Sequence, residues 1–272
     1  MEMNQLYLLQ SVAGYRYSID SFILADFVSP TEENKIVDFG TGNGIIPLLL
    51  SRKTKSKIAG LDIQYSLLQH ARRNIAQNRL ENQVMLIQGD IRFSKSFLKN
   101  GYFDIVVSNP PYRKLNSGRL NPNEEKAIAR HEILITLPEL LKSAFNLLCN
   151  KGKLVMIYLP ERYDELVRTM AEHGLIPKKI RFICSKRNNN PKMFLIEGVK
   201  KEDLPLIPSL ARRGNGVVNK KFPQKTEHFQ KVKTEILDPL YIYDNDGNYT
   251  LEMQKIYDSF NNNRGTNSNR KI

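Results

Sequence analysis

Short apolar runs alternate with longer stretches of helical periodicity along most of the chain from residue 36 onwards. Seven runs have the length of buried strands: Ile36–Phe39, Ile58–Ile63, Val84–Ile87, Asp104–Ser108, Lys153–Leu159, Ile180–Cys184 and Met193–Glu197. Four segments between them have helical spacing: Ile46–Ser51, Leu67–Asn78, Ile133–Leu148 and Arg162–His173. The alternation predicts an α/β fold with a seven-stranded, mostly parallel sheet and helices on both faces. The polar turn Ser185–Pro191 alone joins the last two strands, which predicts an antiparallel hairpin at one edge.

Two regions depart from this regularity. Residues 113–130 are polar and rich in turn formers, so we expect a long loop or lid. After Val199 the periodicity weakens and prolines recur. We therefore predict a core domain at residues 1–200 and a C-terminal extension at residues 201–272, whose last dozen residues are expected to be disordered.

The charge balance indicates a polyanionic partner. The chain has 41 Lys and Arg against 28 Asp and Glu, a net charge of +13, and such an excess attracts polyanions. One stretch holds basic residues without any acidic one: Lys178, Lys179, Arg181, Lys186, Arg187 and Lys192. The 113–130 loop adds Arg113, Lys114 and Arg119. We see no strongly basic amphipathic helix, so nucleic acid is favoured over an anionic membrane.

Other classes of protein are disfavoured. No apolar run approaches the roughly 20 residues that span a bilayer, and the N-terminal segment lacks the pattern of a secretory signal. Cys149 and Cys184 have no His or Cys neighbours at metal-ligand spacing, so neither a metal site nor a disulfide is expected. We expect a cytoplasmic protein without a metal.

The segment Asp38–Gly44 reads D-x-G-x-G-x-G and lies between a predicted strand and a predicted helix. Glycines at Gly40, Gly42 and Gly44 permit a tight turn and let the backbone approach a ligand closely. A dinucleotide fingerprint would place a third glycine at Ile45, and a P-loop would require a lysine, so neither pattern fits.

Two further acids end the next strands. Asp62 ends the second strand, where its carboxylate can accept hydrogen bonds from both hydroxyls of a ribose. Asp90 ends the third strand and can accept from an adenine amino group. An acid at a strand end is often only a turn or cap residue. Three acids at the ends of successive strands, Asp38, Asp62 and Asp90, are much harder to explain in that way.

The fourth strand ends in Asn109-Pro110-Pro111-Tyr112. The prolines stiffen the loop and remove N–H groups, so the Asn109 side-chain oxygen and the Pro110 carbonyl can accept two hydrogen bonds from one NH₂ group. Such acceptors stabilise the positive charge that develops on a planar, poorly nucleophilic nitrogen. Tyr112 offers a ring on which an extruded base can stack.

The motif set resembles the class I, Rossmann-like, S-adenosylmethionine-dependent methyltransferases with an NPPY loop, and in particular the family of tRNA(Val) adenine N6-methyltransferases. Three further segments match that family: Gly14–Phe22, Ala129–Glu132 and Met193–Gly198. The resemblance covers roughly residues 5–200, and the segment Asn245–Tyr257 is similar to the tails of some members. It implies S-adenosyl-L-methionine as cofactor and an adenine N6 amine of tRNA, adenine 37 of tRNA(Val), as acceptor.

The resemblance also assigns site residues. Tyr17, Ser18 and Asp20 would close over the cofactor. The expected cofactor site comprises Tyr17, Ser18, Asp20, Asp38, Gly40, Thr41, Gly42, Gly44, Asp62, Ile63, Asp90, Ile91 and Asn109. The expected catalytic loop comprises Asn109, Pro110, Pro111 and Tyr112. The stretch Lys178–Lys192 and the 113–130 lid are the expected tRNA-binding surface. His131 is interpreted as a structural residue and Tyr163 as a residue on a helix surface.

Two other functions remain open. The same NPPY chemistry suits a protein methyltransferase that modifies a glutamine amide, although such enzymes usually carry a helical N-terminal domain and the residues before Ile36 are too few for one. A non-catalytic RNA-binding protein with a methyltransferase fold is the other alternative, against which the intact glycine loop and NPPY motif argue.

Overall fold

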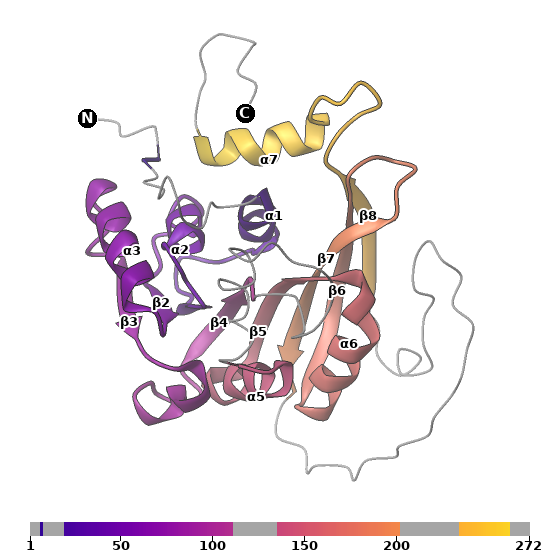
Figure 1. Ribbon diagram of the computed structural model, residues 1–272. Helices are drawn as coiled ribbons and strands as arrows, with labels where there is room; N and C mark the ends of the chain where they lie inside the picture. Colours follow the sequence, from indigo (N-terminus) through magenta and orange to yellow (C-terminus); the bar gives the residue numbers. More distant parts are fainter. Residues whose placement is uncertain (1–5, 8–18, 111–134, 202–233, 262–272) are drawn as a thin grey trace, which may run out of the picture.

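The computed structural model describes residues 6–7, 19–110, 135–201 and 234–261 (Figure 1). Several residues of the expected site lie outside the described residues, namely Tyr17, Ser18, Pro111 and Tyr112. The 113–130 lid, His131 and residues 262–272 of the C-terminal tail also lie outside them.

The described strands form one sheet in the order β3-β2-β1-β4-β5-β7-β6-β8. Their bounds are β1 Ile36–Phe39, β2 Ile58–Asp62, β3 Val84–Gln88, β4 Phe103–Ser108, β5 Leu148–Tyr158, β6 Leu175–Cys184, β7 Pro191–Lys200 and β8 Glu235–Tyr241. Strands β1 to β5 run parallel, whereas β7 is antiparallel to both β5 and β6. The α/β fold, the parallel core and the antiparallel hairpin are therefore confirmed.

In the described part of the chain the sheet has eight strands rather than the expected seven, and the hairpin is not at its edge. The added strand, β8, pairs in parallel with β6 and covers it. Its sequence, EILDPLY, was not predicted to form a strand because it contains Pro239. Proline is tolerated on an edge strand, where one side of the backbone has no partner, and β8 has β6 as its one neighbour in the described sheet.

Helices cover both faces of the sheet. Their bounds are α1 Ile19–Phe27, α2 Ile45–Leu50, α3 Tyr65–Gln77, α5 Leu137–Leu147, α6 Tyr163–Glu172 and α7 Leu251–Asn261, with the 3₁₀ helices η1 Ile91–Ser96 and η2 Pro160–Arg162. Side chains of successive strand residues point to opposite faces, so Ile36 joins the core under α1, α2 and α7, while Val37 joins the core under α5 and α6.

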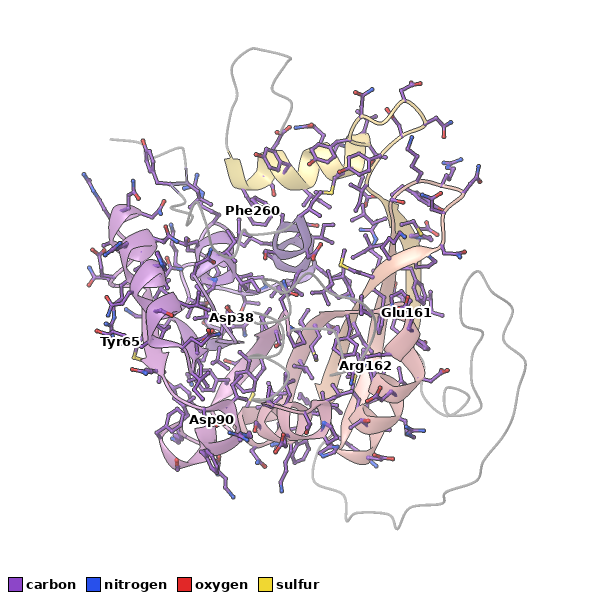
Figure 2. The ribbon with its side chains drawn as sticks, in the orientation of Figure 1. Asp38, Tyr65, Asp90, Glu161, Arg162 and Phe260 are labelled. Atoms are coloured by element: carbon purple, nitrogen blue, oxygen red, sulfur yellow. The ribbon has the colours of Figure 1, made fainter. Side chains whose placement is uncertain are left out.

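The helices α1 and α7, which were not predicted, pack against each other. The ring of Phe22 on α1 lies 5.5 Å from that of Tyr257 and 5.9 Å from that of Phe260, both on α7. Figure 1 shows α7 lying above α1, and Figure 2 shows Phe260 on the side of α7 that faces the rest of the molecule. The C-terminal segment thus contributes both a strand and a helix to the core.

Tyr163 corrects a second expectation. It is 4% exposed rather than a helix-surface residue, and its ring packs against Phe194 of β7 at 5.2 Å and Phe182 of β6 at 5.9 Å. Burial also raises the pKa of its hydroxyl well above the usual range. Tyr163 therefore holds α6 against the hairpin.

The register places all the strand ends that matter for function along one edge. Phe39 pairs with Ser108, so β1 and β4 end side by side. At the other half of the sheet Tyr158 pairs with Phe194, and Cys184 pairs with both Pro191 and Tyr241. The turn after β6 and the segment after β8 consequently emerge at the same edge as the glycine loop.

Candidate active site

The glycine loop connects β1 to α2 in a conformation that requires glycine. Gly40, Gly42 and Gly44 have φ angles of 74°, 56° and 81°, a region that side chains with a Cβ rarely adopt. A Cβ on Gly40 or Gly42 would meet no atom within 4 Å. Backbone at these two positions is therefore open to close approach by a ligand.

Asp62 holds this loop in place from the end of β2. Its Oδ2 accepts a hydrogen bond from the Gly42 amide at 2.8 Å, and its Oδ1 accepts one from the Gln64 amide at 2.8 Å. The side chain is buried, with 3% exposed. A carboxylate oxygen can accept two hydrogen bonds, so both oxygens retain capacity for the hydroxyls of a ribose.

Asp38 is the most unusual group in the site. It is fully buried at the end of β1, and among the described residues nothing donates a hydrogen bond to either carboxylate oxygen. Burial raises the pKa of this carboxyl to about 7; the nearby Thr41 hydroxyl opposes the shift and the charge of Asp62 adds to it. Figure 2 shows Asp38 in the interior of the molecule.

Two neighbours of Asp38 share its lack of partners. The Thr41 Oγ1 and Asn43 Oδ1 atoms are buried and have no hydrogen-bond partner within the described part of the chain. Buried polar atoms are almost always hydrogen-bonded in folded proteins. Four acceptor-capable oxygens around the glycine loop therefore fit a ligand that brings donors and positive charge, such as the ammonium group of an amino acid.

Gly60 leaves room for Thr41 on this side of the sheet. It pairs with Asp38 in the register of β1 and β2, and a Cβ at Gly60 would lie 2.7 Å from Thr41 Oγ1. Sequence reasoning did not identify Gly60 or Asn43, because their roles depend on the pairing of β2 with β1 and on burial.

Asn109 follows β4 directly beside the glycine loop. The Ser108 hydroxyl donates to the Phe39 carbonyl at 3.1 Å, which fixes the two strand ends together. Asn109 and Pro110 are half-buried. The first two residues of the NPPY motif thus begin next to the loop whose buried carboxyl lacks a partner.

Comparisons with known proteins agree with this geometry. The sequence profile of the family described as "Methyltransferase small domain" matches residues 16–169, more than half of the chain. The chain belongs to this family. The expected membership of a methyltransferase family is thereby confirmed.

Relatives and solved structures resemble the chain over most of its length. A tRNA1(Val) (adenine(37)-N6)-methyltransferase from Porphyromonas gingivalis is 30% identical over 195 residues, which cover 69% of this chain and 76% of the relative. A protein of the same name from Bacteroides thetaiotaomicron is 26% identical and covers 75% and 87%. The structure of a predicted O-methyltransferase from Agrobacterium tumefaciens superposes with a TM-score of 0.62 at 15% identity, covering 89% and 97%, and so supports the fold.

Asp90 of this methyltransferase is engaged by its own neighbour. The Arg92 amide donates to Asp90 Oδ1 at 2.9 Å, and the Arg92 guanidinium pairs with Oδ2 at 2.5 Å. The hydrogen bond from the Arg92 side chain lowers the pKa of this carboxyl. Asp90 also caps η1, so Arg92, which sequence reasoning missed, shares the carboxylate with any ligand there.

Three more of the expected cofactor residues lie in the described part of the chain. Ile63, which follows β2, is 36% exposed, and Tyr65 beside it is 55% exposed. Ile91 begins η1 and packs against the core under α5 and α6. Asp20 lies in the first turn of α1. Arg162 at the end of η2 stacks over Tyr158 at 5.0 Å and was also missed.

The expected basic surface is divided between two ends of the sheet. Lys178 and Lys179 lie in the first half of β6, whereas Lys186, Arg187 and Lys192 lie around the turn at its other end. Strand residues rise about 3.3 Å each, so about 20 Å separates the two groups. Arg181 between them is held by Glu252 at 2.5 Å and by the Asp238 carbonyl at 3.0 Å.

Neither a metal-ligand cluster nor a membrane-spanning helix is found in the described ranges. No cluster of three or more His, Cys, Asp or Glu side chains there is arranged to hold a metal ion. None of the helices in those ranges is long and apolar enough to cross a membrane.

Proposed function

We propose that this methyltransferase transfers a methyl group from S-adenosyl-L-methionine to the N6 amine of an adenine in tRNA, adenine 37 of tRNA(Val). The observation that carries the proposal is the position of Asn109 and Pro110, which begin beside the unpartnered carboxyl of Asp38. The names of the relatives from Porphyromonas and Bacteroides supply the acceptor.

The residues around the glycine loop would bind the cofactor through complementary groups. Asp38, with Thr41 and Asn43, would accept from the ammonium group of its amino-acid part, while Asp62 would accept from the ribose hydroxyls. Asp90 and the apolar side chains of Ile63 and Ile91 would hold the adenine. Asp20, together with Tyr17 and Ser18, would close over the bound molecule.

S-adenosylmethionine would supply a methyl group bound to a positively charged sulfur. Attack of a nitrogen lone pair on the methyl carbon would break the carbon–sulfur bond and leave neutral S-adenosylhomocysteine. The adenine amine is a poor nucleophile because its lone pair is delocalised into the ring. The Asn109 side-chain oxygen and the Pro110 carbonyl would each accept a hydrogen bond from one N–H of this amine. These two hydrogen bonds would stabilise the positive charge that develops on the nitrogen. A proton then leaves the cationic nitrogen, and Tyr112 would hold the extruded base by stacking.

The remaining assignments belong to the same proposal. The basic residues of the turn after β6 and the 113–130 lid would contact tRNA, in the cytoplasm. Residues 1–200 would form the methyltransferase domain, and residues 201–272 an extension that supplies β8 and α7.

The test is methyl transfer by the full chain. Labelled S-adenosylmethionine is supplied with unmodified tRNA(Val), with the same tRNA carrying guanosine at position 37, and with a glutamine-containing peptide. We expect N6-methyladenosine, identified by mass spectrometry, in the first sample alone. Transfer to the peptide would favour a glutamine methyltransferase, and cofactor binding by calorimetry without any transfer would favour a non-catalytic RNA-binding protein.

A further inference from the structure

Two turns at the active-site edge are joined into one surface. The first, the basic turn, comprises residues 185–192; the second, the tyrosine turn, comprises residues 242–250. Backbone hydrogen bonds connect them: Ile242 N donates to Cys184 O at 3.0 Å, and Tyr243 N donates to Ser185 O at 2.8 Å. The tyrosine turn is therefore an extension of the β6–β8 pairing and holds a fixed position beside the basic turn.

Side chains strengthen this connection. Lys186 Nζ donates to the Asn245 carbonyl at 3.0 Å, and the Arg187 guanidinium lies 5.9 Å from the centre of the Tyr241 ring. Arg187 and Lys192 are exposed. Two cations thus face solvent next to the tyrosine turn. Figure 1 shows the two turns lying together at the upper end of β6, β7 and β8.

The tyrosine turn carries a stack of rings. Tyr243 and Tyr249 lie 5.4 Å apart with an interplanar angle of 13°, and Tyr249 is followed by Tyr257 of α7 at 6.4 Å. The outermost ring, Tyr243, is 37% exposed. A stack that is anchored in the core at one end and open at the other presents a preorganised aromatic platform.

We infer that the tyrosine turn and the basic turn together bind unpaired RNA nucleotides that flank the target adenine, with a base stacked on Tyr243 and phosphates near Arg187 and Lys192. This inference rests on the proposed function. Bases of single-stranded RNA stack on exposed aromatic rings, and basic residues beside them hold the backbone.

The chemistry of the surface favours unpaired RNA over other partners. Asp244 and Asp246 lie exposed in the tyrosine turn, so this turn offers ring surface rather than positive charge, which suits a base better than an anionic membrane. A paired RNA stem keeps its base faces covered and could use the cations alone. The platform also lies within reach of the reaction, because β6 and β8 are three and four strands from β4, or roughly 14 and 19 Å at about 4.8 Å per strand.

The experiment measures RNA binding by the full chain with two probes of equal phosphate number. One is a stem-loop whose loop contains the unpaired target adenine, and the other is a fully paired duplex. The variants are Tyr243→Ala, Tyr243→Phe and a matched control, Tyr102→Ala. Tyr102 is 39% exposed and lies 4.5 Å from Lys35 Nζ, but it precedes β4 and so lies at the opposite edge of the sheet.

We expect Tyr243→Ala to weaken stem-loop binding by about fivefold to a hundredfold and to leave the salt dependence of binding, duplex binding and S-adenosylhomocysteine affinity unchanged. Tyr243→Phe and Tyr102→Ala should bind the stem-loop like the parent. Unchanged stem-loop binding by Tyr243→Ala, an equal loss on the duplex, or loss of phosphatidylserine-vesicle binding instead would overturn the inference. Absence of methyl transfer by the parent chain would count against the proposed function. The binding results test separately whether the tyrosine turn and the basic turn bind unpaired RNA.

Discussion

The carboxylate of Asp62 and the amide of Gly42 are joined by a hydrogen bond of 2.8 Å. This bond ties the end of β2 to the middle of the glycine loop, where the backbone has a φ of 56°. The residue expected to recognise a ribose is therefore also the residue that fixes the shape of the loop. Cofactor affinity and loop geometry should depend on it together.

We predict that Asp62→Ala weakens S-adenosylmethionine binding by about 1.5–3 kcal/mol, because a charged acceptor is removed and its partners stay unpaired. Isothermal titration calorimetry measures the change. Asp104→Ala is the matched control, since Asp104 accepts from the Lys35 amide at 2.7 Å at the opposite edge of the sheet and should affect stability without affecting cofactor affinity. Unchanged affinity in Asp62→Ala would rule out the assignment.

The raised pKa of Asp38 predicts a pH dependence. The folded-state pKa of about 7 lies above the ordinary value of 3.8. The protonated Asp38 carboxyl therefore adds to the free energy of unfolding of the ligand-free protein at low pH. This contribution is lost as the pH rises from about 4 to about 7. A bound ammonium group requires the ionised carboxylate, so the affinity should show the opposite trend.

We therefore expect the affinity for S-adenosylhomocysteine to rise with pH up to about 7, by at most about tenfold per pH unit, and then to level off. Calorimetry between pH 5.5 and 8 tests this, and buffers of different ionisation enthalpy should reveal proton release near pH 6. Asp38→Asn should bind weakly with no such trend. A flat profile for the parent chain would contradict the role given to Asp38.

Asn109→Ala should lower the turnover number by about a hundredfold or more with little change in cofactor affinity, because the missing acceptor acts mainly in the transition state. Methyl transfer to unmodified tRNA, cofactor affinity and melting temperature should be measured on the same samples. If Asn109 only shaped a turn, stability and cofactor binding would fall together. A folded, fully active Asn109→Ala protein would exclude the catalytic role.

Tyr112 lies outside the described residues, and its prediction follows from the motif alone. Tyr112→Ala should weaken engagement of the extruded base by roughly 1–3 kcal/mol, because stacking is removed. Tyr112→Phe retains the ring and should be milder. Steady-state kinetics with tRNA as the varied substrate distinguish the two, and equal behaviour of both variants would argue against stacking.

The salt dependence of RNA binding should distinguish the basic residues of the basic turn from those in the first half of β6. Removal of one phosphate-binding cation should reduce the log–log salt slope of RNA binding by roughly 0.7–0.9. We expect neutralisation of Lys186, Arg187 and Lys192 to reduce both affinity and slope. The control neutralises Lys178 and Lys179, which lie about 20 Å away along the strand, and should have a smaller effect for each cation removed. The reverse order would place the RNA on the other end of the hairpin.

Strands β1 to β4 were predicted to within one residue at each end, because continuous apolar runs bounded by turn residues are a local signal. Strand β5 begins at Leu148, five residues before the predicted start, because the polar residues between Cys149 and Gly152 interrupt its apolar run. Strand β8 gave no such signal. Its pairing with β6 joins residues more than 50 positions apart, for example Arg181 with Leu237, and Pro239 disguises it. Tyr163 was misjudged for a similar reason, since its partners Phe182 and Phe194 belong to a distant hairpin.

The positions of the candidate site residues follow from the sequence where the apolar pattern locates a strand end, whereas their contacts do not. The glycines, Asp38, Asp62 and Asn109 stand at strand ends that the sequence pattern locates. The division of the basic stretch between two ends of the sheet follows from the length of β6, which was expected to begin at Ile180 but begins at Leu175. The contact between Arg92 and Asp90 depends on the local geometry of η1, which the apolar pattern does not reveal.

Because α7 packs on α1, the nascent chain must wait for its C-terminal segment before α1 is covered. Seven strands are complete at residue 200, but the partner of Phe22 at Phe260 emerges about 60 residues later, which is about 3–12 s at ordinary translation rates. During that interval the nascent chain holds a nearly finished sheet, while Phe22, 4% exposed in the finished protein, lacks its cover. A ribosome that stalls in this stretch would therefore present the apolar helix α1, beside the glycine loop, to chaperones and proteases.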